Sequence, residues 1–310
     1  MMKDKKMKKQ FRRPTHTHAV RDIRRAVIYF SFFIFHFSFA VAATPYAFLT
    51  LPVGAREAAM GETGVSHARG GGASWWNPAL LTRNGGAEFD VVNWFADGRG
   101  SFGGVSVPGR WGGLGAYYFN LGIPDIEVRD RPGPAVGTFT AHNTLAAGGA
   151  AFHIGGNAAA GMTVKWYQDD IYGDAATVSG MVDVGAVWQR GALTLGATAS
   201  NMELWDYVTP DLPITYRAGG AYRWQREEYS VTAAGEAVTP DAGGFYMHFG
   251  AEAGWRETLF LRSGYMAGHD SRAFSFGLGV AKGAYRTDVA VTPYDNGLGQ
   301  VWRVGVGVGW

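Results

Sequence analysis

Residues 302–310 read W-R-V-G-V-G-V-G-W. Every second residue of this stretch, from Trp302 to Trp310, is large and apolar, while Arg303 and three glycines fill the positions between them. Successive side chains of a β-strand point to opposite faces, so the pattern predicts a strand with one apolar face. A tryptophan at each end of such a face is typical of a strand that crosses a membrane between two aromatic belts. The two tryptophans would lie roughly 26 Å apart along the strand, or about 20 Å in height at the usual tilt, which suits a thin bilayer.

The same period of two recurs along the chain. It is clear over residues 214–224 and 245–255 and weaker over 158–167, 193–200 and 273–281. No apolar run after the first 43 residues is long enough to cross a bilayer as a helix. The alternation therefore predicts about fourteen strands, near residues 87–95, 100–107, 112–120, 143–152, 158–167, 178–188, 193–201, 214–224, 228–236, 245–255, 258–266, 273–281, 285–292 and 300–310.

The connections between these strands alternate between short and long, except for one tight outward connection at Asp97-Gly98. Outer-membrane barrels have short periplasmic turns and longer outward loops, whereas a soluble β-sandwich has no reason to sort its loops in this way. The fold class we expect is all-β: a transmembrane antiparallel β-barrel of about 14 strands, with an N-terminal plug that contains short helices.

Residues 1–43 have the three parts of a secretory signal peptide. A basic region is followed by an apolar region at residues 26–39 and by the small residues Ala40-Val41-Ala42, with cleavage expected near Ala42 or Ala43. The alternative is an uncleaved membrane anchor, because the apolar run approaches the length that spans a bilayer. A cleaved signal followed by a barrel predicts the outer membrane of a Gram-negative-type bacterium.

Residues 44–86 are too apolar for a free tail and too irregular for strands. We expect them to form a plug folded into or under the barrel, which itself would span residues 87–310. Short helices are expected over residues 55–60 and 78–81, the second with Asn77 as its N-cap.

Charges of both signs fall on the face of the strands that points away from lipid. These expected lumen charges are Lys165, Asp183, Arg217, Arg223, Glu228, Glu236, Glu252, Arg262, Arg286, Asp288 and Arg303. Two hypotheses fit them: a structural network of ion pairs, or a selectivity lining for a permeating solute. The lipid-facing pattern also predicts an aromatic belt made of Trp224, Phe245, Trp255, Trp302 and Trp310.

Nothing in the chain indicates an enzyme. It has no cysteine, a net charge of only +2, and no metal-spaced histidine cluster or nucleophile motif. His142, His153 and His248 lie on or beside predicted strands and are expected to be structural. We therefore expect no catalytic residue, no cofactor, no metal and no nucleic-acid partner.

The plug segment closely resembles the PorV/PorQ family of outer-membrane proteins, which is related to the FadL-like barrels. The residues that carry this resemblance are Leu51, Gly54, Ala55, Arg56, Ala58, Met60, Gly61, Trp76, Asn77 and Pro78. Near the C-terminus, Arg262-Ser263-Gly264-Tyr265 and the closing Trp310 are similar as well. The resemblance implies a fourteen-stranded barrel with a plug on the periplasmic side.

The resemblance also implies a function. Members of the family are accessory components of type IX protein secretion or surface attachment, which makes secretion-system or cargo proteins the first expected partners beside outer-membrane lipid. FadL-like relatives carry hydrophobic small molecules across the outer membrane, and this is the alternative. A structural barrel without a solute is the third hypothesis. The short outward loops of this chain argue against a cargo-binding shuttle.

Overall fold

The structure, a computed structural model, describes residues 47–129, 132–170, 177–206, 212–241 and 243–310. The predicted signal peptide lies outside these residues. Contacts divide the chain into two units, Met1–Ala40 and Val41–Trp310, and the barrel belongs to the second.

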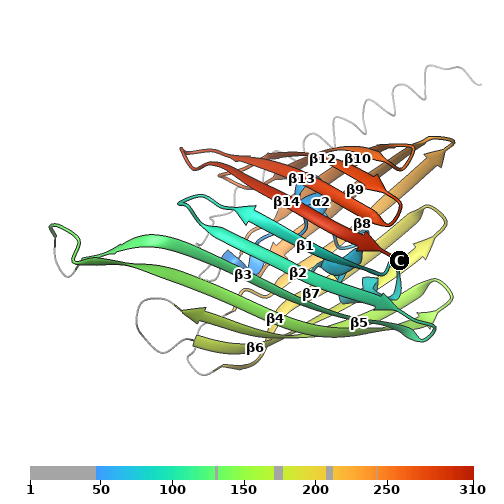
Figure 1. Cartoon of the computed structure of the whole chain (residues 1–310). Helices are drawn as coiled ribbons and strands as arrows, with labels where there is room; N and C mark the ends of the chain where they lie inside the picture. The colour runs from blue at the N-terminus through green and yellow to red at the C-terminus, as the bar shows by residue number, and fades with distance from the viewer. Residues whose placement is uncertain (1–46, 130–131, 171–176, 207–211, 242) are drawn as a thin grey trace, which may run out of the picture. The chain divides into compact units, whose positions relative to one another are not determined.

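Over the described residues, fourteen strands form one closed antiparallel barrel (Figure 1). Each strand pairs with its neighbours in sequence, and β1 pairs with β14 to close the sheet. The strands are β1 (Gly86–Asn93), β2 (Arg99–Pro108), β3 (Gly112–Val128), β4 (Gly137–Gly155), β5 (Ala158–Asp170), β6 (Thr177–Arg190), β7 (Leu193–Asp206), β8 (Thr215–Arg226), β9 (Tyr229–Pro240), β10 (Tyr246–Trp255), β11 (Leu259–Ala267), β12 (Phe274–Lys282), β13 (Tyr285–Tyr294) and β14 (Gly299–Gly309). The predicted fold class and strand number are confirmed.

The two ends of the barrel differ in their connections. One end, here called the turn end, has connections of two or three residues and carries the start of β1 and the C-terminus. The opposite end, here called the loop end, has connections of four to eight residues. This is the asymmetry of short inner turns and longer outer loops that outer-membrane barrels show.

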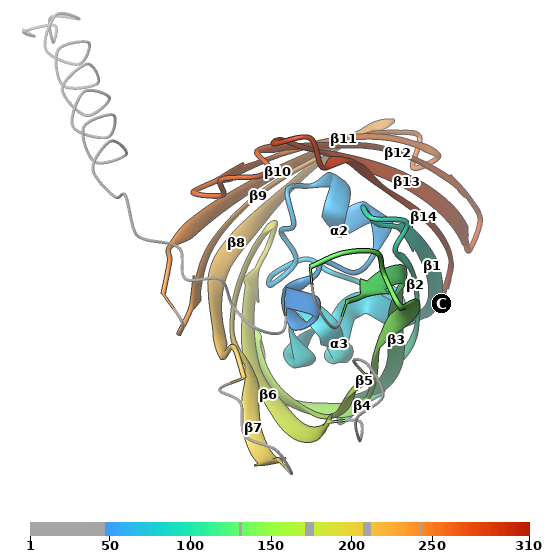
Figure 2. The ribbon, with the colours of Figure 1, turned by 90° about the vertical axis from the view of Figure 1, so that its left-hand side faces the viewer.

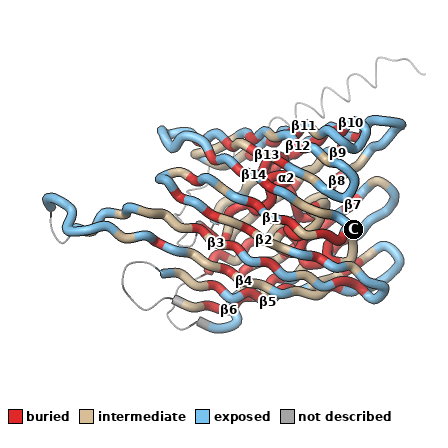
Figure 3. Tube along the Cα trace, viewed as in Figure 1, coloured by how far each residue is buried: buried red, intermediate tan, exposed pale blue. Residues whose placement is uncertain are grey.

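The strands alternate between exposed and buried residues, as the sequence pattern predicts (Figure 3). In β14, Val304 and Val306 are 42% and 50% exposed, whereas Val301 and Arg303 are 0% and 3% exposed. The large apolar side chains of the outer face are therefore left uncovered by protein, which is the surface that a lipid-embedded barrel presents.

Strands β3 and β4 are longer than predicted. Their ladder continues past a bulge between Ile123 and Ile126, where Asp125 has a φ of 58°. The sequence pattern did not indicate this extension because a hairpin that projects beyond the barrel rim does not have to alternate between lipid and lumen.

Residues 47–85, here called the lumenal segment, lie inside the barrel (Figure 2). The segment contains η1 (Ala47–Thr50), α2 (Ala55–Ala59), η2 (Gly70–Gly72), α3 (Ala73–Trp76) and η3 (Pro78–Thr82), and its helices contact β1 to β6 and β11 to β14. In the part of the chain that the structure describes, none of the helices has the length and apolar character needed to span a membrane.

Two of these helices were predicted. Helix α2 lies within the expected range, and η3 begins after Asn77, whose side-chain oxygen accepts a hydrogen bond from the Ala79 N–H at 3.0 Å. The helices η1, η2 and α3 are only three or four residues long, which is too short for an amphipathic period to be seen in the sequence.

The lumenal segment approaches the wall closely where both surfaces are glycine. A Cβ on Gly264 of β11 would lie 1.9 Å from the backbone nitrogen of Gly61, and a Cβ on Gly61 would lie 2.5 Å from the Phe249 carbonyl oxygen. Gly61 also has a φ of 70°, which favours glycine. These two positions explain why backbone meets backbone here without a side chain between them.

Candidate functional site

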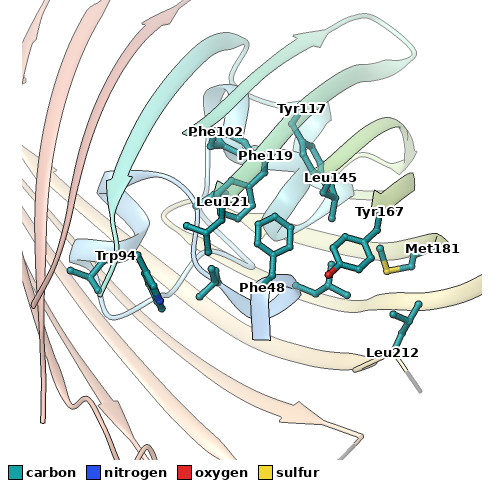
Figure 4. Packing of buried hydrophobic residues seen from close by; sticks show 14 of the residues in the cluster. Phe48, Trp94, Phe102, Tyr117, Phe119, Leu121, Leu145, Tyr167, Met181 and Leu212 are labelled. Atoms are coloured by element: carbon teal, nitrogen blue, oxygen red, sulfur yellow. The ribbon is translucent and has the colours of Figure 1, made fainter. Parts of the chain in front are cut away.

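The loop-end half of the barrel interior is apolar and aromatic. Inward side chains of the strands meet the start of the lumenal segment in one buried group, here called the apolar lumenal cluster (Figure 4). Its members are Phe48, Leu49, Leu51, Val53, Trp94, Phe102, Tyr117, Phe119, Leu121, Leu145, Tyr167, Met181, Leu212, Tyr294 and Val301. Phe48 stacks on Phe119 with ring centroids 4.6 Å apart and faces Tyr167 at 5.9 Å.

The other half of the interior is held by a buried network of ion pairs. Glu252 of β10 accepts a bidentate pair of bonds from Arg56 of α2, with Nε and Nη2 at 2.9 and 3.0 Å. The same carboxylate lies 2.6 Å from Nε of Arg262 and 3.3 Å from Nη2 of Arg69. Asp288 continues the network through contacts of 2.7 Å to Arg262 and 2.6 Å to Arg286.

Strand side chains also bind backbone groups of the lumenal segment. Glu236 accepts from the N–H groups of Gly64 and Val65 at 2.9 and 3.0 Å and from Arg217 at 2.7 Å. Ser275 accepts from the Gly61 N–H at 2.9 Å and donates to the Ala59 carbonyl at 3.0 Å.

Helix α2 is also fixed at its first turn. Asp90 accepts from the Ala55 N–H at 2.9 Å, which satisfies a first-turn donor that Gly54, as N-cap, cannot serve with a side chain.

The sequence-predicted lumen charges fall into groups. Glu252, which binds Arg56, belongs to the ion-pair network of the turn-end half together with Arg262 and Asp288. Lys165 pairs with Asp183 at 2.6 Å beside the apolar lumenal cluster. Arg223 is half exposed and lies 3.5 Å from Glu257.

Two further predicted charges, Arg303 and Glu228, lie outside these groups. Arg303 is buried with its guanidinium carbon 5.6 Å from the centre of the Trp94 ring. Glu228 was expected on a strand facing the lumen, but it lies exposed in the turn between β8 and β9 and pairs with Arg256 at 2.8 Å. The alternation itself holds, since Ser230 and Thr232 are buried, but β9 begins at Tyr229, one residue later than predicted, and Glu228 therefore falls in the turn.

The motif residues of the lumenal segment are all buried. They hold the segment together and against the wall: Arg56 through Glu252, and Trp76 through a bond of 3.2 Å from its indole N–H to the Val53 carbonyl. Asn77 donates to the carbonyls of Val65 and Ala186 at 2.8 and 3.0 Å. The remaining motif residues, Leu51, Gly54, Ala55, Ala58, Met60, Gly61 and Pro78, pack between these anchors.

The predicted belt residues all point outward. Trp224, Trp255 and Trp310 lie at the turn end and are 45%, 40% and 61% exposed, whereas Trp302 and Phe245 lie at the loop end and are 41% and 48% exposed. Phe245 stands one residue before β10 rather than within it. The five side chains therefore lie exposed near the two ends of the barrel.

A titratable group that the sequence did not single out joins the lumenal segment to the loop end. Glu62 accepts a hydrogen bond of 2.9 Å from Nη2 of Arg272, which follows β11, and its carboxylate also lies 2.9 Å from Nε of the same arginine. Burial, the largest single effect, would raise the pKa of Glu62, but the charge and hydrogen bond of Arg272 together with the nearby His248 and His269 outweigh it and lower the pKa to about 2. His269 lies 2.9 Å from His248, and burial together with Arg272 lowers the pKa of His269 to about 3. His248, expected to be structural, therefore has partners that no local pattern could reveal.

The part of the chain that the structure describes holds no group of three or more histidine, aspartate or glutamate side chains placed to bind a metal ion. The arrangement is that of a barrel whose turn-end half holds an ion-pair network and whose loop-end half holds the apolar lumenal cluster beside the Glu62–Arg272 and Lys165–Asp183 pairs.

The comparisons with known proteins agree on the fold. No family model and no curated protein matches the chain. The toluene transporter TodX of Pseudomonas putida superposes with a TM-score of 0.56 at 13% identity, over 83% of this chain and 96% of that chain. CymD, a monoaromatic hydrocarbon channel, gives 0.58 at 11% identity over 83% and 96% of the two chains. A FadL homologue of Pseudomonas aeruginosa gives 0.50 at 12% identity over 82% and 97%.

The chain therefore has a FadL-like barrel fold. None of these matches points to the PorV/PorQ family in particular.

Proposed function

We propose that this protein is an outer-membrane channel that admits apolar small molecules. In this proposal residues 1–43 are removed as a signal peptide, residues 44–86 act as a plug, and residues 87–310 form the membrane-spanning barrel. The lipid-facing surface and the exposed aromatic side chains near the two ends of the barrel support the membrane location.

The apolar lumenal cluster carries the proposal. The interior of a membrane barrel is ordinarily polar, because it is filled with water or with ion-paired side chains. Here inward positions of the strands in the loop-end half, such as Phe119, Leu121 and Leu145, are apolar instead and are buried in the apolar lumenal cluster. Apolar walls bind apolar ligands and exclude water, which suits a path for molecules that partition out of water.

The fold neighbours favour the same function. TodX is described as a toluene transporter and CymD as a monoaromatic hydrocarbon channel. These matches favour the hydrophobic-transport alternative over the secretion accessory that the sequence resemblance suggested first. The ion-pair network then serves to hold the plug rather than to select ions.

The test is uptake of radiolabelled toluene by a Gram-negative host that lacks hydrocarbon channels of its own. Cells that express the protein should take up toluene faster than cells with an empty vector. The variant Leu145→Asn places an amide in the apolar lumenal cluster and should lower the rate severalfold. Ser230→Asn, at a buried inward position of the turn-end half, is the matched control and should leave the rate near that of the wild type.

Uptake equal to that of the empty-vector cells, with folded protein in the outer membrane, would contradict the proposal. The hypothesis of a structural barrel without a solute would then remain. Equal losses from both variants would show that the rate does not depend on the apolar lumenal cluster.

A further inference from the structure

A cavity lies at the turn end, away from the apolar lumenal cluster. It has a volume of about 410 Å³ and lies between the lumenal segment and the wall formed by β6 to β9. Its charged lining consists of four arginines, Arg56, Arg69, Arg83 and Arg223, together with His67. No aspartate or glutamate lines it among the residues that the structure describes.

Of the four guanidinium groups, Arg56 is well paired with acids and Arg223 has a partly exposed acidic partner. Arg56 is held by the bidentate contact with Glu252 and also lies 2.8 Å from Glu57. Arg223 lies 3.5 Å from Glu257 in the β10–β11 turn. The other two guanidinium groups are poorly compensated.

Arg69 shares its carboxylate with stronger competitors. Its one acidic contact in the described part of the chain is Nη2 to Glu252 at 3.3 Å, and that carboxylate already binds Arg56 and Arg262 at 2.6 to 3.0 Å. The Nε of Arg69 is buried without a hydrogen-bond partner. The positive charge of Arg56, together with burial, lowers the pKa of Arg69 to about 9, which indicates an excess of positive charge at this point.

Arg83 lacks an ion-pair partner altogether within the described residues. Its side chain donates to Gln189, a neutral amide, and its Nε is buried without a partner. A buried donor without an acceptor costs free energy, and a charged one costs more, so Arg69 and Arg83 bring poorly compensated positive charge to the lining of the cavity.

We propose that this cavity binds a phosphate ester whose organic part carries hydroxyl groups, with glycerol phosphate as the simplest example. Guanidinium groups match phosphate oxygens with parallel hydrogen bonds, and the poorly compensated guanidinium groups of Arg69 and Arg83 line the cavity. The rest of the polar lining, which includes Ser66, Thr194, Thr232 and Gln225, offers hydroxyl and amide groups to the organic part. The volume is that of a small-ligand site and exceeds what a bare phosphate fills. The phosphate ester comes either from solution or from the headgroup of a phospholipid.

The first experiment measures binding of sn-glycerol 3-phosphate to the detergent-purified protein by calorimetry. The wild type should bind it and should bind neutral glycerol at least tenfold more weakly, with affinity that falls as salt rises. Arg69→Gln and Arg83→Gln should each weaken binding about tenfold or more. Arg110→Gln removes an exposed arginine from the β2–β3 turn at the same end and should leave binding unchanged.

The second experiment distinguishes the source of the phosphate. The protein in nanodiscs of mixed phosphatidylglycerol and phosphatidylcholine is analysed by native mass spectrometry for retained lipid. Retention of phosphatidylglycerol that Arg69→Gln and Arg83→Gln abolish, without binding of the free ester, supports the lipid headgroup as the source. Binding of the free ester that Arg69→Gln and Arg83→Gln abolish supports a soluble ligand.

Failure of both probes to bind, or binding that the two variants leave unchanged, would overturn the proposal. Electrophoretic mobility of the unheated, folded barrel confirms that each variant is folded. The proposal does not rest on hydrocarbon passage, because the cavity and the apolar lumenal cluster share no residues.

Discussion

At the residue scale, Glu252 is the centre of the turn-end network. One carboxylate that is 3% exposed contacts three guanidinium groups, two from the lumenal segment and one from β11. A buried charge of this kind is stable only while its partners remain, since each partner left alone keeps its cost of desolvation.

Glu252→Gln should therefore destabilise the folded barrel by about 3 kcal/mol, because it leaves buried arginines without their shared counter-charge. Urea unfolding from lipid vesicles, followed by tryptophan fluorescence, measures this. Glu257→Gln removes a carboxylate that is 64% exposed and should change the free energy of unfolding by less than about 1 kcal/mol. Equal effects of the two substitutions would show that the network contributes no more than a surface pair.

Gly264→Ala should destabilise the contact between β11 and the lumenal segment by about 1 to 3 kcal/mol, since the new methyl group would collide with the backbone at Gly61. Limited proteolysis should cut the lumenal segment faster in this variant. Gly148→Ala is the matched control, because its methyl group would meet no atom within 4 Å. Unchanged proteolysis in Gly264→Ala would mean that the segment does not depend on this approach.

At the element scale, the lumenal segment is held by groups whose charge state matters. His67 accepts a bond from Arg56 at 3.0 Å through Nδ1 and contacts the Thr63 hydroxyl at 3.1 Å through Nε2. Burial and the charge of Arg56 lower the pKa of His67 to about 3. Protonation would place a second positive charge against the guanidinium.

Stability should therefore fall as the pH falls from about 6.5 toward 3. A histidine whose pKa is lower in the folded state binds a proton in the unfolded state first, so its contribution is complete above pH 6.5 and is lost on acidification. Each of His67 and His269 should contribute a slope of up to about 1.4 kcal/mol per pH unit to the free energy of unfolding, since each takes up one proton on unfolding. Glu62 adds to the loss only below about pH 4.5, its ordinary pKa.

Urea unfolding at a series of pH values measures this dependence. His67→Gln should flatten the part of the curve between pH 6.5 and 3, whereas His153→Gln, on the exposed face near the β4–β5 turn, should not. A wild-type curve that is flat over this range would contradict the lowered pKa of His67 and of His269.

The sequence predicted the strands because lipid on one face and protein on the other impose a period of two. It did not predict the extension of β3 and β4. There Asp125 lies in a bulge, in a part of the hairpin that does not have to alternate between lipid and lumen. The alternation predicted Glu252 and Glu236 as inward charges, yet their partners Arg56 and Gly64 lie 196 and 172 residues away. Alternation fixes which face a side chain takes, whereas pairing across the lumen depends on how the inner segment folds.

At the scale of the whole molecule, the outer face of the barrel is the surface that meets lipid in the proposed function. The outer face carries exposed apolar side chains such as Phe276 and Leu278, which are 48% and 61% exposed. In water a surface of this extent would drive aggregation, whereas in a bilayer it is the stable arrangement.

Site-directed spin labelling tests this claim most directly, because the chain has no cysteine and each introduced one is unique. Labels at Leu278→Cys and Val306→Cys, in protein reconstituted into lipid, should be relaxed strongly by oxygen and weakly by a water-soluble nickel chelate. Labels at Arg110→Cys and Arg129→Cys, in exposed connections at the turn end and the loop end, should show the reverse. Strong relaxation by nickel at Leu278 and Val306, equal to that at the two connections, would contradict a membrane-spanning barrel.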